Sequence, residues 1–331
     1  KFALCGGMLA GMLASCTGDY MDYNTNPYEA TKDQMDRDAY LTRSALTGMQ
    51  GYVIPTDVLL NQFLEALLGG PYGGYLAESN SGFTNRFSNY NQSQDWVGKL
   101  YKDAIPNVYA NYAQLEAATE DPVYLSVGKV VKVAAILRVT DGYGPIPYSK
   151  IISKTGEVSL TVPYDSQEEV YKQMFKELDE VRDVLNDNLT LSAEAFRRFD
   201  NVYQGNLSKW LKFTNSLKLR MAMRLTYIPE MKEEARRIAE EAVASGVITL
   251  NADNALLKVE ENRAAMIFND WNDHRVGADI ISYMNGYKDP RREKMFTIVK
   301  VKGTTPNTEA DGYAGIRIGI DVASKNKMTG A

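Results

Sequence analysis

The chain has 331 residues, of which 44% are hydrophobic and 24% charged, a composition that is typical of a folded globular protein and excludes extended disorder. Its formal net charge of -5, without a run of basic residues, excludes nucleic acid as a general partner. Both cysteines, Cys5 and Cys16, lie near the N-terminus, so disulfides cannot stabilise a chain that has lost its leader.

The first feature along the chain is an apolar stretch at 2–13, which is too short to cross a bilayer, since a membrane-spanning helix needs about 20 residues. It is typical of the hydrophobic region of a secretion signal, and because the sequence begins without methionine we expect part of the basic region to be absent. Residues 13–16 read LASC and resemble the lipobox of bacterial lipoproteins. We therefore predict a lipoprotein signal peptide at 1–15, acylation of Cys16 and a polar tether at 16–32.

Amphipathic periodicity near 3.6 residues dominates from residue 33 onward and predicts a mostly α fold. Helices are expected at 33–50, 56–68, 95–119 with a break at Pro106, 122–140, 167–186, 207–227 and 229–245. Three local signals mark helix ends: a capping box of Ser166 and Glu169, a first-turn proline at Pro229 and a left-handed Gly246. After residue 246 the pattern predicts irregular structure with a few short strands and a Gly- and Thr-rich tail.

The helix expected from residue 207 has a clear apolar face. Helical spacing predicts that this face lines the core with Leu207, Trp210, Leu211, Leu217, Met221 and Leu225. Short links between consecutive helices predict antiparallel helix pairs, but no repeat of the ~34 residues typical of tetratricopeptide units is visible.

Four segments resemble, in wording and order, proteins of the SusD/RagB family. They are RVTDGYGPIPY at 138–148, VYKQMFKELDEV at 170–181, the run from Asp200 through GNLSKWLKFTNSLKLRMAMR to Arg224, and ISYMNGYKDPR at 281–291. The resemblance implies a SusD-like helical domain over 33–331 with tetratricopeptide-like antiparallel helix pairs and a ligand face of irregular loops. We interpret the four motifs themselves as scaffold. Because family members usually continue beyond this length, we expect the C-terminal part of the domain to be missing.

The same resemblance implies a lipoprotein that is anchored by lipid on the exposed side of the outer membrane. It would capture oligosaccharides and deliver them to a SusC-like TonB-dependent transporter. The RagB branch implies oligopeptides as the alternative ligand, and a purely structural helical-repeat adaptor is a further alternative.

Catalytic signatures are scarce, which favours a binding protein over an enzyme. His274 is the only histidine, so a zinc motif with two histidines is impossible, and neither a Gly-x-Ser-x-Gly elbow nor a phosphate-binding loop of the Walker type is present. We therefore predict no catalytic residue and no cofactor. A secreted glycoside hydrolase with a carboxylate pair stays open as the competing class.

Two segments combine the flat aromatic faces that contact sugar rings with the planar amide and charged groups that bind their hydroxyls. The candidate ligand-binding residues are Tyr72, Tyr75, Phe83, Asn85, Arg86, Tyr90 and Trp96 in the first, and Trp271, Asn272 and Arg275 in the second. Packing of these aromatics against the helices is the alternative, above all for Trp96 at a helix start. Asp270 and Asp273 could instead bind calcium, although they lack the spacing of an EF-hand loop.

Overall fold

The computed structural model describes residues 39–321, apart from 192, 199, 260, 262 and 303–308. The chain divides into two compact units, residues 1–41 and residues 42–331. The second unit contains every element described below except the first two residues of α4. The expected signal peptide, Cys16 and the tether lie outside the described residues.

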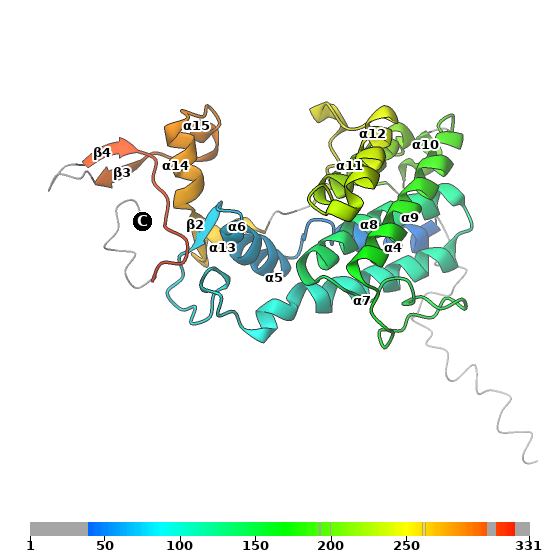
Figure 1. Cartoon of the computed structure of the whole chain (residues 1–331), viewed down its shortest axis with the longest axis horizontal. Coiled ribbons are helices and arrows are strands. Elements are labelled where there is room, and N and C mark those ends of the chain that lie inside the picture. Colours follow the sequence, from blue (N-terminus) through cyan, green and yellow to red (C-terminus); the bar gives the residue numbers. More distant parts are fainter. Residues whose placement is uncertain are drawn as a thin grey trace, which may run out of the picture. The chain divides into compact units, whose positions relative to one another are not determined.

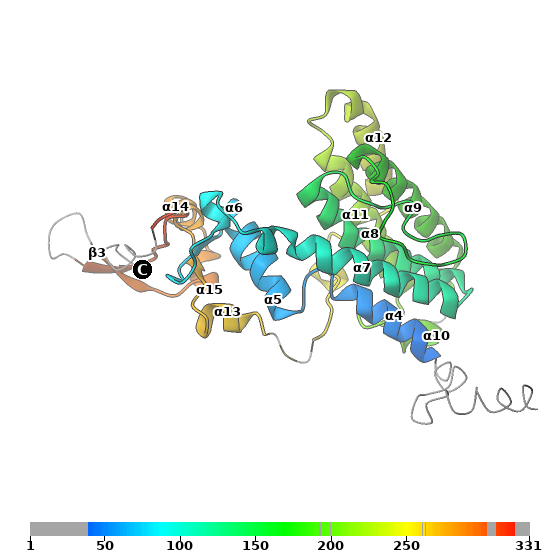
Figure 2. The same ribbon diagram turned by 90° about the horizontal axis from the view of Figure 1, so that it is seen from below.

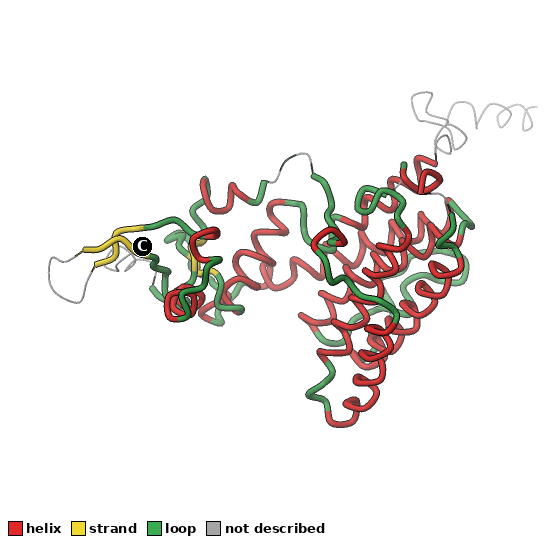
Figure 3. The backbone as a smooth tube through the Cα atoms, turned by 90° about the horizontal axis from the view of Figure 1, so that it is seen from above, coloured by secondary structure: helices red, strands yellow, loops and turns green. Residues whose placement is uncertain are grey.

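The described chain is mostly helical (Figures 1 and 3). Its α-helices are α4 (Tyr40–Gln50), α5 (Val58–Asn61), α6 (Gly70–Tyr72), α7 (Gln94–Ala118), α8 (Pro122–Tyr143), α9 (Gln167–Asp187), α10 (Ala193–Arg197), α11 (Leu207–Arg224), α12 (Lys232–Ala244), α13 (Ala265–Asn269), α14 (Ala278–Gly286) and α15 (Arg292–Met295). A π-helical segment, η2 (Gln62–Gly69), joins α5 to α6, and short 3₁₀ turns occupy Phe87–Asn89, Pro229–Met231 and Asn251–Asp253.

The strands are short and pair antiparallel: β1 (Leu76–Glu78) with β2 (His274–Val276), and β3 (Val299–Lys302) with β4 (Glu309–Gly312). The register of the first pair places Leu76 opposite Val276 and Glu78 opposite His274. The mostly α fold with a few short strands that the sequence predicts is therefore confirmed.

The long helices pack on one another in chain order. The contacting pairs are α7 with α8, α8 with α9, α9 with α11 and α11 with α12, and Figure 2 shows these helices side by side. Helix α8 meets α7, α9 and α11, and accordingly its residues Val130, Val131, Val133, Ala134, Ala135, Ile136 and Leu137 are all buried. A helix that is apolar around its whole circumference belongs in an interior, so α8 forms the centre of this helical core.

A buried ion pair joins α8 to α9. The Lys132 ammonium lies 3.0 Å from Oε1 of Glu177, and the Tyr148 hydroxyl donates to Oε2 of the same carboxylate at 2.6 Å. The ammonium also lies 4.8–5.9 Å from the ring centroids of Tyr109, Tyr112 and Tyr148. These contacts compensate the desolvation of both charges, and they explain why the Ile-Pro-Tyr turn folds back onto the helices.

The entry to α11 is held by a single buried carboxylate. Oδ1 of Asp200 accepts hydrogen bonds from the backbone amides of Val202 and Tyr203, each at 2.9 Å. Its Oδ2 accepts from the amide of Gly205 at 2.9 Å and from the indole of Trp210 at 2.8 Å. The apolar residues predicted for this helix are buried, which confirms the face that periodicity assigned: Leu207, Trp210, Leu211, Leu217, Met221 and Leu225.

The three predicted helix-end signals are confirmed. The Ser166 hydroxyl accepts from the Glu169 amide while the Glu169 carboxylate accepts from the Ser166 amide. Pro229 opens the 3₁₀ turn that leads into α12, and Gly246 follows the end of α12 with φ of 90°.

The break predicted at Pro106 is wrong, because α7 runs without interruption from Gln94 to Ala118. A proline inside a helix removes one backbone hydrogen bond and strains the preceding turn. Here Ala104, Ile105, Val108 and Tyr109 are buried on either side of it. Tertiary packing thus supports the helix through the proline.

Candidate functional site

The short β1–β2 pair brings the two candidate segments together, although they lie far apart in the sequence. Next to the paired strands, the Ser79 amide donates to the Asp273 carbonyl at 2.8 Å and the Ser79 hydroxyl donates to the Asn272 carbonyl at 2.7 Å. The Asn80 amide nitrogen donates to Oδ1 of Asp273 at 2.8 Å and to the Trp271 carbonyl at 3.3 Å. The loop that begins at Tyr72 and the segment around Trp271 therefore form one surface region.

Three of the candidate aromatics point into solvent. Tyr72, Tyr75 and Tyr90 are between 52% and 81% exposed, and the rings of Tyr72 and Tyr90 stack with centroids 5.9 Å apart and an interplanar angle of 28°. Buried Glu78 of β1 accepts hydrogen bonds from the Ser88 amide and hydroxyl, which folds the loop back so that Tyr90 meets Tyr72. Such an exposed, paired aromatic surface can contact the C–H face of a sugar ring.

The Tyr72 hydroxyl lies in surroundings that disfavour its ionised form. The pKa of Tyr72 is raised, chiefly by its partial burial and further by Tyr90 and Glu78. The Tyr72 phenol therefore keeps its proton at physiological pH and can donate a hydrogen bond to a ligand hydroxyl.

The remaining aromatics of the loop form an inward-facing cluster. The Trp96 ring lies 5.0 Å from Phe83, 5.7 Å from Phe87 and 5.2 Å from Phe63 of η2, measured between centroids. Trp96 and Phe83 are half-buried. This arrangement favours the packing alternative for Trp96 and Phe83, which hold the loop that presents Tyr72 and Tyr90.

The two polar candidates of the loop are engaged with the backbone. The Asn85 amide donates to the Asn91 carbonyl at 2.6 Å, and Nη1 of Arg86 donates to the Ile320 carbonyl at 2.8 Å. Asn85 is exposed and could still reach a ligand, whereas Arg86 ties the loop to the segment after β4.

In the second segment, Trp271 packs against the buried cluster of Val58, Ala66 and Ile267. The Arg275 guanidinium lies 4.3 Å from the Phe268 ring centroid and donates to the Phe268 and His274 carbonyls. Asn272 adopts a left-handed conformation with φ of 57°, which orients its carbonyl toward Ser79. All three candidates therefore contribute to the packing where the two segments meet, and their side chains are only partly exposed.

The geometry gives little support to a calcium site at Asp270 and Asp273. Both oxygens of the buried Asp273 carboxylate already accept hydrogen bonds, from Gln62 and from Asn80. Within the described residues, no three His, Cys, Asp or Glu side chains lie close enough together to hold a metal ion.

Two exposed tyrosines were not among the candidate ligand-binding residues predicted from the sequence. Tyr283 and Tyr287 of the segment at 281–291 were assigned to scaffold, yet both rings project from α14 into solvent. Ile281 and Met284 supply the buried face of that helix. The signal that could have found the tyrosines is their spacing of four residues, which places both rings on one side of the helix.

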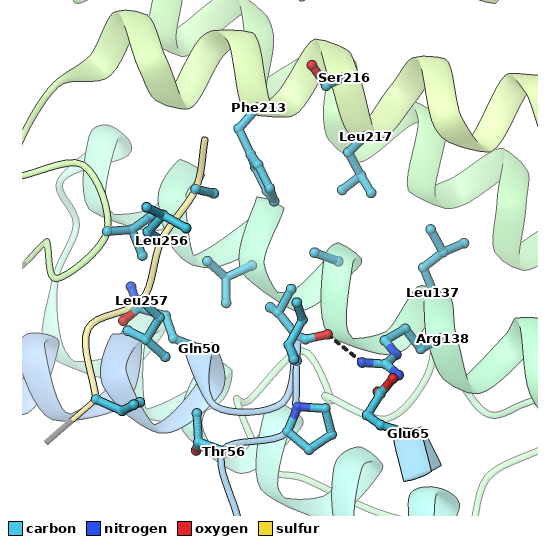
Figure 4. A pocket seen from close by; sticks show the side chains of 18 of the residues that line it. Gln50, Thr56, Glu65, Leu137, Arg138, Phe213, Ser216, Leu217, Leu256 and Leu257 are labelled. Carbon is cyan, nitrogen blue, oxygen red and sulfur yellow. Dashed lines mark hydrogen bonds and ion pairs between the residues drawn. The ribbon is translucent and has the colours of Figure 1, made fainter. Parts of the chain in front are cut away.

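A separate cavity of about 820 Å³ lies between α8, α11 and the segments at 53–56 and 255–257 (Figure 4). Its apolar wall includes Leu137, Phe213, Leu217, Leu256 and Leu257, and Arg138 crosses one side, pairing with Glu65 and donating to the Val53 carbonyl at 2.9 Å. None of the candidate residues lines it. The buried amide of Gln50 also lines it, and neither of its polar atoms has a hydrogen-bond partner among the described residues.

Each described helix is either too short or too polar to cross a membrane.

Comparisons with known proteins agree with this architecture. The model of the SusD-like family, described as SusD and RagB outer membrane lipoproteins, matches residues 22–331. A solved SusD homologue from Bacteroides thetaiotaomicron VPI-5482 is 47% identical with a TM-score of 0.76, over 85% of this chain and 56% of that chain. A second SusD homologue, from Bacteroides ovatus ATCC 8483, is 38% identical with a TM-score of 0.75, over 86% of this chain and 57% of that chain. No curated protein matches the chain.

A third solved relative, a chitin-binding SusD homologue from Flavobacterium johnsoniae, is 31% identical with a TM-score of 0.73 and aligns over 86% of this chain and 58% of its own. The chain thus spans less than two thirds of the length of these three solved relatives. The family match covers nearly the whole sequence and agrees with the helical fold. The chain therefore belongs to the SusD-like family of outer membrane lipoproteins.

Proposed function

We propose that this chain is the ligand-capturing part of a lipid-anchored outer membrane protein that binds oligosaccharides and passes them to a SusC-like TonB-dependent transporter. The observation that carries the proposal is the exposed Tyr72–Tyr90 stack, together with exposed Tyr75 directly before β1, where the two candidate segments meet. Exposed aromatic faces are costly to leave in water and suit the apolar faces of pyranose rings.

Two further observations support this function. Family membership supports an outer membrane lipoprotein, and the chitin-binding relative from Flavobacterium johnsoniae supports a saccharide as the ligand class. We propose that the ligand is bound without turnover. The lipobox-like LASC sequence supports anchoring through Cys16 on the exposed side of the membrane.

Alanine substitution of Tyr90 tests the ligand assignment. Because the ring is highly exposed and supports no core packing, we expect Tyr90→Ala to fold normally and to weaken oligosaccharide binding by about tenfold. Tyr227→Ala, which removes a still more exposed ring after α11, is the matched control and should bind like the wild type. Isothermal calorimetry after a glycan-array screen supplies the affinities.

The same assay separates the alternatives. Binding of oligopeptides in place of saccharides would assign the protein to the RagB type, and release of shortened products would make it a hydrolase. Equal saccharide affinities of Tyr90→Ala and the wild type would remove the aromatic stack from the site.

The lipid anchor is tested by substitution of Cys16. We expect Cys16→Ser in the precursor to abolish acyl labelling and to release the protein from the membrane fraction, since the thiol is the acylated group. Retention of label in the serine variant would contradict the anchor assignment.

A further inference from the structure

Two exposed aromatic rings lie at the C-terminal end of α14. Tyr283 and Tyr287 are 68% and 82% exposed, and their rings are parallel, with an interplanar angle of 3° and centroids 6.4 Å apart. Ile281 and Met284 supply the buried face of this helix, so neither tyrosine ring is needed to cover the core. Single exposed apolar residues are common on protein surfaces, but two parallel rings that support no packing form a surface suited to a ligand.

This surface begins next to the proposed ligand site. The Ile280 amide donates to the Gly74 carbonyl at 3.2 Å and the Gly277 amide donates to the Tyr75 carbonyl at 2.9 Å, so the start of α14 is bound to the turn that carries Tyr75. From Asp279, which lies beside Gly74, Tyr283 follows after one helical turn and Tyr287 after two, about 6 and 12 Å along the axis. The helix that carries the pair therefore starts at the turn that carries Tyr75.

We infer that Tyr283 and Tyr287 form a second saccharide platform, which continues the ligand site from Tyr75 along α14 and selects oligosaccharides of several residues over short ones. The inference rests on the proposed function. Two exposed rings with centroids 6.4 Å apart can each contact one of two successive sugar rings of a linear chain. The exposed Asp279 carboxylate, which has no ion-pair partner within the described part of the chain, accepts hydrogen bonds from sugar hydroxyls at the near end.

The surroundings of the pair favour a sugar over a protein partner. The exposed neighbours on this side of the helix are Ser282, Gly286 and Lys288, which are small or charged. A stable protein interface needs a broader core that is poor in charged residues. A narrow aromatic strip with polar edges matches a single polysaccharide chain.

The test compares ligand lengths. The Tyr283→Ala/Tyr287→Ala double variant and the wild type are titrated with linear oligomers of N-acetylglucosamine, glucose, xylose and mannose, from disaccharides to hexasaccharides. We expect the double variant to bind the hexasaccharide of the recognised series about tenfold more weakly and the disaccharide unchanged. The Tyr283→Phe/Tyr287→Phe variant keeps both rings and should retain wild-type affinity, and Tyr227→Ala is the control for loss of an exposed tyrosine.

The outcomes distinguish this inference from the proposed function. If the double alanine variant binds every length like the wild type while Tyr90→Ala weakens binding, the platform is wrong and the proposed function stands. If the double variant keeps its saccharide affinity but no longer copurifies with an outer membrane protein, the pair is a protein contact and the inference is overturned. If the wild type binds no oligomer in the panel, the proposed function fails and the platform with it.

Discussion

His274, the only histidine of the chain, lies in β2 at the centre of the junction between the two candidate segments. Burial lowers its pKa below the ordinary value of 6.5; the neighbouring Asp273 opposes this shift and Arg275 adds to it. The imidazole is therefore neutral in the folded protein at physiological pH, and it contributes to the junction by packing edge-on against Phe268.

The lowered pKa predicts a pH-dependent stability. As the pH falls below about 6.5, the unfolded chain takes up a proton on His274 before the folded chain does, so the free energy of unfolding decreases between about pH 7 and pH 5. Urea denaturation across this range should show the decrease in the wild type and a smaller one in His274→Gln. The single histidine signal in NMR reports the folded pKa directly, and a midpoint at or above that of the unfolded chain would contradict the prediction.

At the scale of single elements, the entry to α11 depends on Asp200, whose carboxylate accepts the four hydrogen bonds described above. This gives the family-like run from Asp200 to Trp210 a physical meaning. One carboxylate closes the turn that precedes the helix and fixes the buried indole at its first turn.

Replacement of that carboxylate by an amide tests its role. Asp200→Asn should lower the free energy of unfolding by about 3 kcal/mol, because the new NH₂ group faces donors and leaves buried hydrogen bonds unmade. The surface variant Asp183→Asn, which loses only an exposed ion pair with Arg182, should change stability by less than about 1 kcal/mol. Chemical denaturation measures the free energy of unfolding of both variants. Equal losses would show that Asp200 does not stabilise the fold more than an exposed carboxylate does.

At the scale of the whole molecule, a cavity of about 820 Å³ separates parts of α8 and α11 from residues 255–257. Gln50 is 95% buried beside it, and among the described residues neither polar atom of its amide has a hydrogen-bond partner. A buried amide without partners costs free energy, since it has given up its hydrogen bonds to water.

We therefore expect Gln50→Leu, which is similar in volume, to raise the free energy of unfolding of this chain by about 1 kcal/mol. Gln50→Ala is the control: it enlarges the cavity and should give less stabilisation than leucine or a net loss. Thermal and chemical unfolding measure the two variants. A clear loss of stability in Gln50→Leu would mean that the amide has a partner in the folded protein beyond the described residues.

Much of the fold could be predicted because its signals are local. The capping box of Ser166 and Glu169, the left-handed Gly246 and the apolar face of α11 each depend on residues within a few turns of one another. The prediction at Pro106 was wrong because the outcome depended on burial by distant helices, which local preference does not include.

For the candidate site, the sequence predicted which residue types are present but not which of their side chains are exposed. Tyr90 and Trp96 stand close together in one aromatic, amide-rich loop, yet one ring is exposed and the other packs against Phe63. Nothing in the local pattern separates them, because the difference arises from η2 and β1, to which the loop folds back.

By itself, the sequence determined the mostly helical class, the ends of several helices, the family and the two segments rich in sugar-binding residue types. Only the tertiary structure decided that those segments meet, through β1–β2 and the hydrogen bonds from Gln62, Ser79 and Asn80 to the segment at 271–273. It also decided which tyrosines face solvent. The physical reason is that periodicity and capping act within one element, whereas exposure and strand pairing depend on residues about two hundred positions apart.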